Sequence, residues 1–203
     1  AGGGIRVGGF AATGARARNR LFFRAVDPCS PDLADVAALA AFYSCFYALD
    51  RAHYLALIAK LRLPPGKKLA SFSKGMRRQA FLALALSIDC EVLLLDEAFD
   101  GLDPLALDTV KEEIVSTYGE NGKTVLVASH NLQSLDRLCD RFVMIADGRK
   151  YAEGTADDIG KSFAKFQVAV RNGLDAKAVS QLGLDVVSFR KNGSVYEIVC
   201  RDN

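Results

Sequence analysis

The sequence lacks the features that would assign it at once to several classes of protein. Its 26 Lys and Arg residues nearly balance 24 Asp and Glu residues, so a net charge of +2 gives no broad positive surface for a nucleic acid. No apolar run approaches the ~20 residues that span a bilayer. Five cysteines stand without a CxxC pair or a pairing with histidine, which favours reduced cytosolic thiols over a zinc site or a disulfide frame.

An initiator methionine and a targeting peptide are also missing, and the chain opens on Ala1 in what already reads as the middle of a domain. Gly9–Arg16 has glycines spaced as in a phosphate-binding loop. Such a loop needs a lysine and a Ser/Thr hydroxyl, and Ala15 and Arg16 occupy those places. We therefore expect Gly4–Arg16 to form an ordinary strand and turn, and the chain to be a fragment without its natural start.

The sequence does contain a strand that ends in two acids. Val92–Leu95 supplies four apolar residues, and Asp96 and Glu97 follow directly. A buried parallel strand has this pattern when it delivers carboxylates to the carboxyl edge of a sheet. The alternative is an exposed strand end whose acids cap the next turn.

A helix with a polar start stands just ahead of this strand. Ser73 is a natural N-cap for a helical run over Met76–Ser87. Gly75 allows backbone N–H groups to approach an anion at the positive end of the helix. Lys74 could add charge toward a phosphate, or it could be a solvated loop lysine.

Leu69–Gln79 and Glu91–Glu97 together resemble the signature loop and the Walker B strand of ABC-type ATPases. The resemblance extends over about residues 1–160. The signature loop has the form Ser-Lys-Gly-Met at residues 73–76, which is similar to that of cassettes from bacterial multi-component exporters. Lys74 and Met76 depart from the common signature, where a glycine and a glutamine stand. In this family the P-loop segment would lie upstream of Ala1.

The resemblance implies roles for individual residues, with ATP and Mg²⁺ as the cofactors. Asp96 would hold Mg²⁺, and Glu97 would be the catalytic base that polarises the attacking water. Ser73, Lys74 and Gly75 would bind the nucleotide's phosphates.

Two further positions match the family pattern. Asp103 lies in Ala98–Pro104, which resembles the D-loop and implies a role in cofactor binding. His130 follows the apolar strand Thr124–Ala128, where the family's catalytic switch histidine reads the γ-phosphate. A lone histidine is otherwise a packing residue, as we expect for His53.

The glutamine that contacts the metal in this family has no match ahead of Gln79. Asp27 could stand in as a metal-facing oxygen. Because it precedes Pro28, the pattern favours an ordinary turn residue over that role.

Alternating strands and helices predict an α/β fold class, with a P-loop NTPase-like parallel sheet core and an inserted helical subdomain. Strands are expected at Leu21–Val26, Val92–Leu95, Thr124–Ala128 and Arg141–Ile145. The helical subdomain would cover about residues 30–88, with helices that begin at Ser30 and Asp50.

Two domains follow from this pattern. Residues 1–160 would form a partial ABC ATPase domain, and residues 161–203 a small C-terminal α+β appendage. In the first, a helix over Leu132–Cys139 would precede the last core strand. In the second, a short helix over Asp175–Leu182 precedes Asn192-Gly193, which lies between alternating runs and predicts a hairpin.

These features predict the ATP-binding, ATP-hydrolysing subunit of an ABC transporter at the cytoplasmic face of the cell membrane. A second cassette, in a homo- or heterodimer, would complete the ATP site and drive a transmembrane permease docked on Asp32–Leu63. No nucleic-acid partner is expected, and the fragment alone should be inactive. The alternatives are a non-transport ABC ATPase and a non-catalytic cassette that completes a partner's ATP site.

Overall fold

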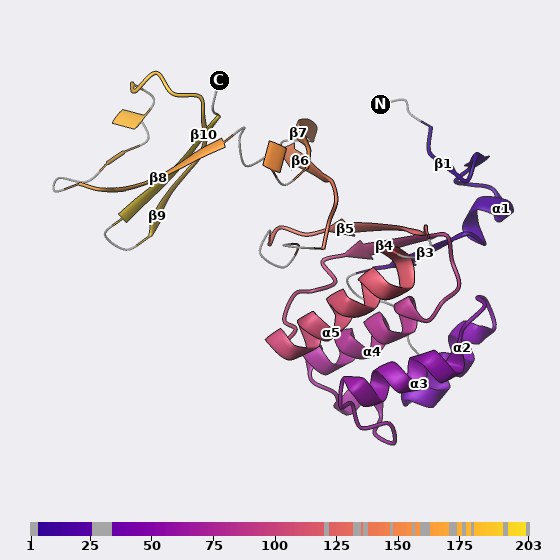
Figure 1. The fold of residues 1–203 in the computed structure, drawn as a ribbon. Coiled ribbons are helices and arrows are strands. Elements are labelled where there is room, and N and C mark those ends of the chain that lie inside the picture. The colour runs from indigo at the N-terminus through magenta and orange to yellow at the C-terminus, as the bar shows by residue number, and fades with distance from the viewer. Residues whose placement is uncertain are drawn as a thin grey trace. The chain divides into compact units, whose positions relative to one another are not determined.

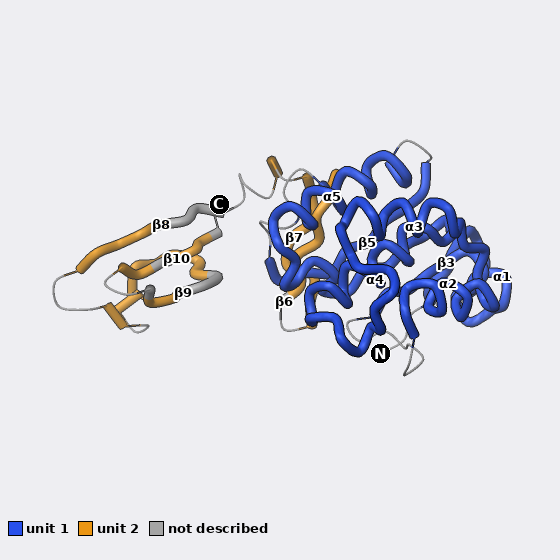
Figure 2. Tube along the Cα trace, turned by 90° about the horizontal axis from the view of Figure 1, so that it is seen from below, with its two compact units in different colours: residues 1–138 blue, residues 139–203 orange. Residues whose placement is uncertain are grey.

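The computed structural model describes residues 4–25, 34–119, 122–131, 135, 138–146, 148–155, 157–158, 163–170, 174–175, 178–179, 181–192 and 195–201. The chain divides into two compact units, residues 1–138 and 139–203 (Figure 2). The second unit thus begins ahead of the domain boundary expected at residue 160.

Unit 1 opens with a β-hairpin and continues as strands and helices in alternation (Figure 1). Its elements are β1 (Arg6–Val7), β2 (Phe10–Ala11), α1 (Ala15–Arg18), β3 (Leu21–Arg24), α2 (Val36–Ser44), α3 (Arg51–Lys60), the 3₁₀ helix η1 (Leu69–Ser71), α4 (Lys74–Leu86), β4 (Val92–Asp96), α5 (Pro104–Ile114), the π-helical segment η2 (Val115–Gly119) and β5 (Thr124–Ala128).

A parallel three-stranded sheet, in the order β3-β4-β5, confirms the predicted parallel core. Phe22, Leu93 and Val125 stand in register across it. α4 and α5 cover one face of the sheet, and α3 packs on α4 (Figure 1). On the other face Phe23 and Leu126 are 53% and 63% exposed, so the described residues cover the sheet on one side only.

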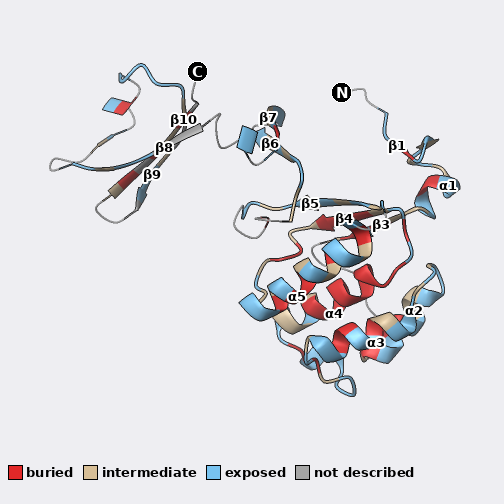
Figure 3. Ribbon diagram, in the orientation of Figure 1, coloured by how far each residue is buried: buried red, intermediate tan, exposed pale blue. Residues whose placement is uncertain are grey.

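Helix α4 forms the centre of the core. Every residue from Gln79 to Leu86 is buried, as the continuous red ribbon in Figure 3 shows. A helix that is apolar all round can be stable only when other elements surround it. No helix among the described residues is long and apolar enough to cross a bilayer.

Two of the predicted helix caps are confirmed. The Asp50 carboxylate accepts a hydrogen bond from the backbone N–H of His53 at 2.9 Å and begins α3. The Ser73 hydroxyl accepts one from the N–H of Met76 at 3.1 Å and begins α4. Each cap satisfies one of the backbone donors that a helix start leaves unpaired.

The start of α2 differs from the prediction. The helix begins at Val36, because the Asp35 carboxylate accepts a hydrogen bond from the N–H of Ala38 at 2.8 Å and caps it there. Ser30, the predicted cap, lies outside the described residues, and so does Asp27.

The glycine-rich start is an ordinary strand and turn, as predicted. β1 and β2 pair antiparallel, and the turn residues Gly8 and Gly9 have φ values of 55° and 83°. Two successive positive φ angles are what a tight two-residue hairpin requires. The guanidinium of Arg16 then lies over the Phe10 ring, 5.5 Å from its centroid.

Unit 2 contains two small antiparallel sheets. One pairs β6 (Phe142–Ala146) with β7 (Arg149–Gly154), and the other has the order β8-β10-β9. The strands of the second sheet are β8 (Phe163–Ala169), β9 (Val186–Asn192) and β10 (Val195–Arg201).

The prediction that Arg141–Ile145 forms a final strand of the core sheet is wrong. β6 pairs with the segment directly after it, and Gly148, with φ of 71°, lies in the connection. Val143 and Ile145 are 54% and 74% exposed. A hairpin between neighbouring segments has a low loop-closure entropy, so an apolar strand can pair locally instead of joining a distant sheet.

The C-terminal appendage has a small hydrophobic core of its own, which Val179, Ile198 and Cys200 form. Antiparallel pairing of β9 with β10, from Asn192↔Val195 onward, confirms the predicted hairpin, although Gly193 itself lies outside the described residues. Only parts of the predicted helices 132–139 and 175–182 are described.

Candidate active site at the ends of strands β4 and β5

Glu97 and His130 meet where two parallel strands end. The backbone N–H of Glu97 donates to the carbonyl of Ala128 at 2.9 Å, which continues the β4–β5 pairing past Asp96. The parallel register therefore brings Glu97 next to the residues that follow β5. Glu97 Oε2 lies 3.0 Å from His130 Nδ1.

The electrostatics of this pair favour a charged imidazole. The hydrogen bond to Glu97, together with the negative charges of Glu97 and Asp100, raises the pKa of the exposed His130. Glu97 itself has a φ of 45°, in the left-handed region that residues other than glycine rarely adopt. A side chain held in such a backbone conformation at a strand end is a common feature of functional sites.

A second carboxylate, that of Asp100, lies close to the Glu97–His130 pair. Ligand atoms from Glu97, Asp100 and His130 all lie within 4.8 Å of one another. Two carboxylates suit Mg²⁺, which prefers oxygen ligands and keeps several of its waters. The cluster thus fits a hydrated divalent cation. Asp96, the predicted metal ligand, is outside this cluster. Asp100 was not predicted from the sequence, where its one signal is that it is the third acid after the apolar run Val92–Leu95.

Sequence reasoning missed a buried cation beneath these acids. Arg24, at the end of β3, is 1% exposed, and its Nη1 donates to the main-chain carbonyl of Asp96 at 3.2 Å. Its Nε and Nη2 are buried without a hydrogen-bond partner. Burial and the nearby charge of Arg78 lower the pKa of Arg24 to about 10, while Asp96 opposes that shift.

The predicted signature residues surround the start of α4. Ser73 and Lys74 are exposed there, and the 13-residue helix presents its positive end to solvent. Gly75 lies against the loop after β4, because a Cβ added to it would come within 2.8 Å of the Gly101 carbonyl oxygen. An exposed helix start with a lysine fits the phosphates of a nucleotide such as ATP.

Asp103 serves the fold through both of its oxygens. Oδ1 accepts a hydrogen bond from the N–H of Ala106 at 2.9 Å and caps α5, and Oδ2 accepts one from Gln79 at 3.1 Å. Asp103 therefore joins the loop to α4. The structure places it with Ser73 and Gly75, around α4, and places Glu97 with His130 at the sheet edge.

Comparison with known proteins identifies the family. The sequence profile described as "AAA domain, putative AbiEii toxin, Type IV TA system" matches residues 34–136, which is half of the chain. The chain belongs to this AAA-domain family. The matched region contains β4, β5, α4 and each predicted site residue, so the family assignment and the site geometry concern the same part of the AAA domain.

Curated relatives of this AAA domain are ABC transporter ATP-binding proteins, which confirms the predicted ABC resemblance. A Nod factor export ATP-binding protein I from Burkholderia orbicola (strain AU 1054) is 44% identical over 96 residues, 47% of this chain and 31% of the relative. The protein of that name from Paraburkholderia xenovorans (strain LB400) is 37% identical over 125 residues, 57% of this chain and 41% of the relative. The chain thus spans less than half the length of these relatives.

Solved structures confirm the P-loop NTPase-like α/β fold class. An ATP-binding subunit of an ABC transporter superimposes with a TM-score of 0.67 and 27% identity, covering 77% of this chain and 68% of that one. A putative cobalt transport ATP-binding protein has a TM-score of 0.66 at 19% identity, over 99% of this chain and 71% of that one, which supports the fold alone.

Proposed function

We propose that this chain is the ATP-binding and ATP-hydrolysing region of an ABC transporter subunit. The observation that carries the proposal is the contact of Glu97 with His130 at 3.0 Å, at the carboxyl ends of two parallel strands. Open α/β sheets bind their ligands at that edge. Hydrolysis of a phosphoanhydride requires a positioned base and charge stabilisation, and the pair supplies both kinds of group.

Each residue has a proposed task. Glu97 accepts a proton from the attacking water, and His130, held by Glu97, keeps that carboxylate oriented and offers its other ring nitrogen to the γ-phosphate. Asp96 is proposed to hold a hydrated Mg²⁺, which would neutralise charge on the phosphates. Ser73, Lys74 and Gly75 would bind phosphates at the positive end of α4.

The proposed site is composite. The glycine-rich segment forms the β1–β2 hairpin, and the four-residue helix α1 follows, so among the described residues nothing grips the β- and γ-phosphates as a P-loop does. Residues 73–75, here called the Ser73 loop, would instead contact nucleotide bound to a second cassette, in a homo- or heterodimer. We expect the chain as given not to hydrolyse ATP by itself.

Association with a full-length cassette tests this proposal. A full-length ABC cassette, held in its ATP-bound state by replacing its own Glu97 equivalent with Gln, should bind the chain in the presence of ATP and not in its absence. Ser73→Arg should abolish that binding by obstructing the phosphate. Ser71→Arg, at an exposed position two residues earlier, is the matched control.

Two results would overturn the proposal. One is association that is unaffected by Ser73→Arg. The other is tight ATP binding by the chain alone in calorimetry, because losing several charge-assisted contacts at about 1.5–3 kcal/mol each should weaken binding by orders of magnitude.

Turnover tests the two catalytic assignments in a chain extended to carry a GxxxxGK[ST] loop. Glu97→Gln should abolish steady-state hydrolysis and keep ATP binding, and His130→Ala should lower hydrolysis strongly. Hydrolysis by Glu97→Gln within about threefold of the parent, a barrier change under ~1 kcal/mol, would show that Glu97 is not the base.

The membrane partner is proposed to dock on the helical subdomain, at the cytoplasmic face of the membrane. Phe46, just after α2, is 67% exposed, and its ring centroid lies 5.5 Å from that of Phe42. Cysteines placed in residues 34–63 should cross-link to cytoplasmic loops of a permease. Cross-links confined to residues after Phe163 would contradict this docking surface.

A second candidate function rests on the hairpin at Gly8-Gly9. If no P-loop is encoded ahead of this chain, it is a non-catalytic cassette that completes the ATP site of a partner. The encoded sequence upstream of Ala1 distinguishes the two candidates.

A further inference from the structure

The loop after β4, residues 97–103, is fastened to α4 by two neighbouring side chains. Arg78 donates a guanidinium hydrogen bond to the main-chain carbonyl of Asp100. Gln79 Nε2 donates to Asp103 Oδ2 at 3.1 Å, from a side chain that is almost fully buried. Both donors come from the helix whose first turn holds the signature residues.

A third contact joins the same two segments and involves no side chain at all. A Cβ added to Gly75 would lie 2.8 Å from the carbonyl oxygen of Gly101, a separation that real Cβ atoms essentially never show. The obstacle is backbone, so it cannot rotate out of the way. Gly75 does not have a positive φ, so shape, not backbone conformation, requires a glycine here.

We infer that Gly75 and Gln79 are positioning residues that hold the loop 97–103 against α4. The loop begins with Glu97 and contains Asp100, so these contacts fix the acids as well as the loop. The start of α4 and the carboxylate cluster of one chain then behave as one body. A second molecule that presses on the Ser73 loop moves the acids of the same chain.

This consequence rests on the proposed function, but the contacts themselves need no nucleotide. Every test below is therefore made on the chain alone, without ATP. If these tests succeed while ATP-dependent association fails, the proposed function falls and the inference stands.

The sign of a stability change gives the first test. At a position with room for a methyl group, Gly→Ala restricts the unfolded chain and stabilises the fold. Gly66 has such room, with nothing within 4 Å of an added Cβ. Gly75→Ala should lower the thermal denaturation midpoint, whereas the matched variant Gly66→Ala should raise it or leave it unchanged. A raised midpoint in Gly75→Ala would overturn the close approach to Gly101.

A rescue experiment gives the second test and does not depend on Gly75. Gln79→Glu removes the donor and sets two carboxylates face to face, so amide hydrogen exchange in residues 99–103 should become about tenfold faster. Adding Asp103→Asn restores a donor, and asparagine caps a helix as well as aspartate does. Exchange in the double variant should return to the parent rate.

The rescue result decides whether Gln79 is a positioning residue. Exchange that stays at the parent rate in Gln79→Glu would show that the hydrogen bond to Asp103 does not hold the loop. Fast exchange that persists in the double variant would show that Gln79→Glu acts by disturbing the buried face of α4. Either result overturns the inference.

Discussion

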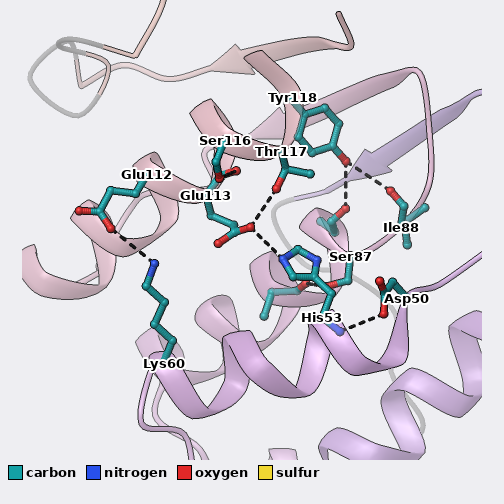
Figure 4. Close-up of polar contacts among 12 residues, drawn as sticks. Asp50, His53, Lys60, Ser87, Ile88, Glu112, Glu113, Ser116, Thr117 and Tyr118 are labelled. Carbon is teal, nitrogen blue, oxygen red and sulfur yellow. Dashed lines mark hydrogen bonds and ion pairs between the residues drawn. The ribbon is translucent and has the colours of Figure 1, made fainter. Parts of the chain in front are cut away.

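The imidazole of His53 lies 2.8 Å from the carboxylate of Glu113, and this contact joins α3 to α5 (Figure 4). The same carboxylate oxygen accepts a hydrogen bond from the Thr117 hydroxyl at 2.8 Å. His53 therefore has a structural task between two helices, in agreement with the expectation from the sequence. It also links the helical subdomain to α5, the helix that Asp103 caps.

A double-mutant cycle should measure this link. His53→Ala and Glu113→Ala, singly and combined, should give a coupling energy of about 1 kcal/mol in urea unfolding, because both side chains are mostly buried. Lys60 and Glu112 join the same two helices at 3.4 Å and are 48% and 72% exposed. That pair is the matched control, and its coupling should stay below about 0.5 kcal/mol. Equal couplings for the two pairs would show that burial does not strengthen the His53 contact.

The pKa of His130 should depend on Glu97. In an NMR titration of the chain, the pKa of His130 should lie above the ordinary value of 6.5, and Glu97→Gln should lower it. Because the folded pKa is raised, the pair stabilises the fold fully below the unfolded pKa, and this stabilisation is lost as pH rises through the folded value. Glu113→Gln, which alters the other histidine's partner, should leave the pKa of His130 unchanged. An identical pKa in Glu97→Gln would mean that the contact is absent in solution.

Removing the buried charge of Arg24 should stabilise the fold. The guanidinium is 1% exposed and has two unpartnered nitrogens, so its desolvation is only partly compensated. Arg24→Met should raise the free energy of unfolding by about 1–3 kcal/mol in urea. Arg20→Met, where the guanidinium forms an exposed pair with Glu91, should stay within about 0.5 kcal/mol of the parent. A large loss of stability in Arg24→Met would show that its bond to the Asp96 carbonyl outweighs desolvation.

The hydroxyl of Tyr118 should contribute a measurable amount to stability. Tyr118 is 1% exposed, and its hydroxyl lies 3.5 Å from the carbonyl of Ala85, in the last turn of α4, and 3.4 Å from that of Ile88, just after the helix (Figure 4). Tyr118→Phe keeps the ring and should lower the free energy of unfolding by about 1 kcal/mol. A neutral substitution would mean that these long contacts contribute little.

Local signals in the sequence predicted local structure well. Val92–Leu95 followed by two acids gave a parallel strand, and Asp50 and Ser73 gave two helix starts, because each depends on residues within one turn or one strand. The caps could be read because a hydroxyl or carboxylate satisfies a donor only three residues away.

Features that depend on distant neighbours were not predictable. Arg24 looks like any strand residue, and it is buried only because β3 lies in register with β4 and faces the helices. The same holds for Gly75, whose neighbour Gly101 is 26 residues away in the sequence (101 − 75). The apolar pattern of β6 did not reveal which strand it pairs with, because a strand of this pattern can pair either with the next segment or with a distant sheet.

The left-handed backbone of Glu97 also has an evolutionary consequence. At a φ of 45°, glycine or asparagine has a lower conformational energy than glutamate. Stability therefore favours one residue at this position, and the proposed chemistry favours another. A lineage that no longer needed the carboxylate would be free to exchange it and become more stable. The persistence of glutamate at this position among descendants of the gene would therefore be a record of continued selection for chemistry, and its replacement by glycine would date the loss of that selection.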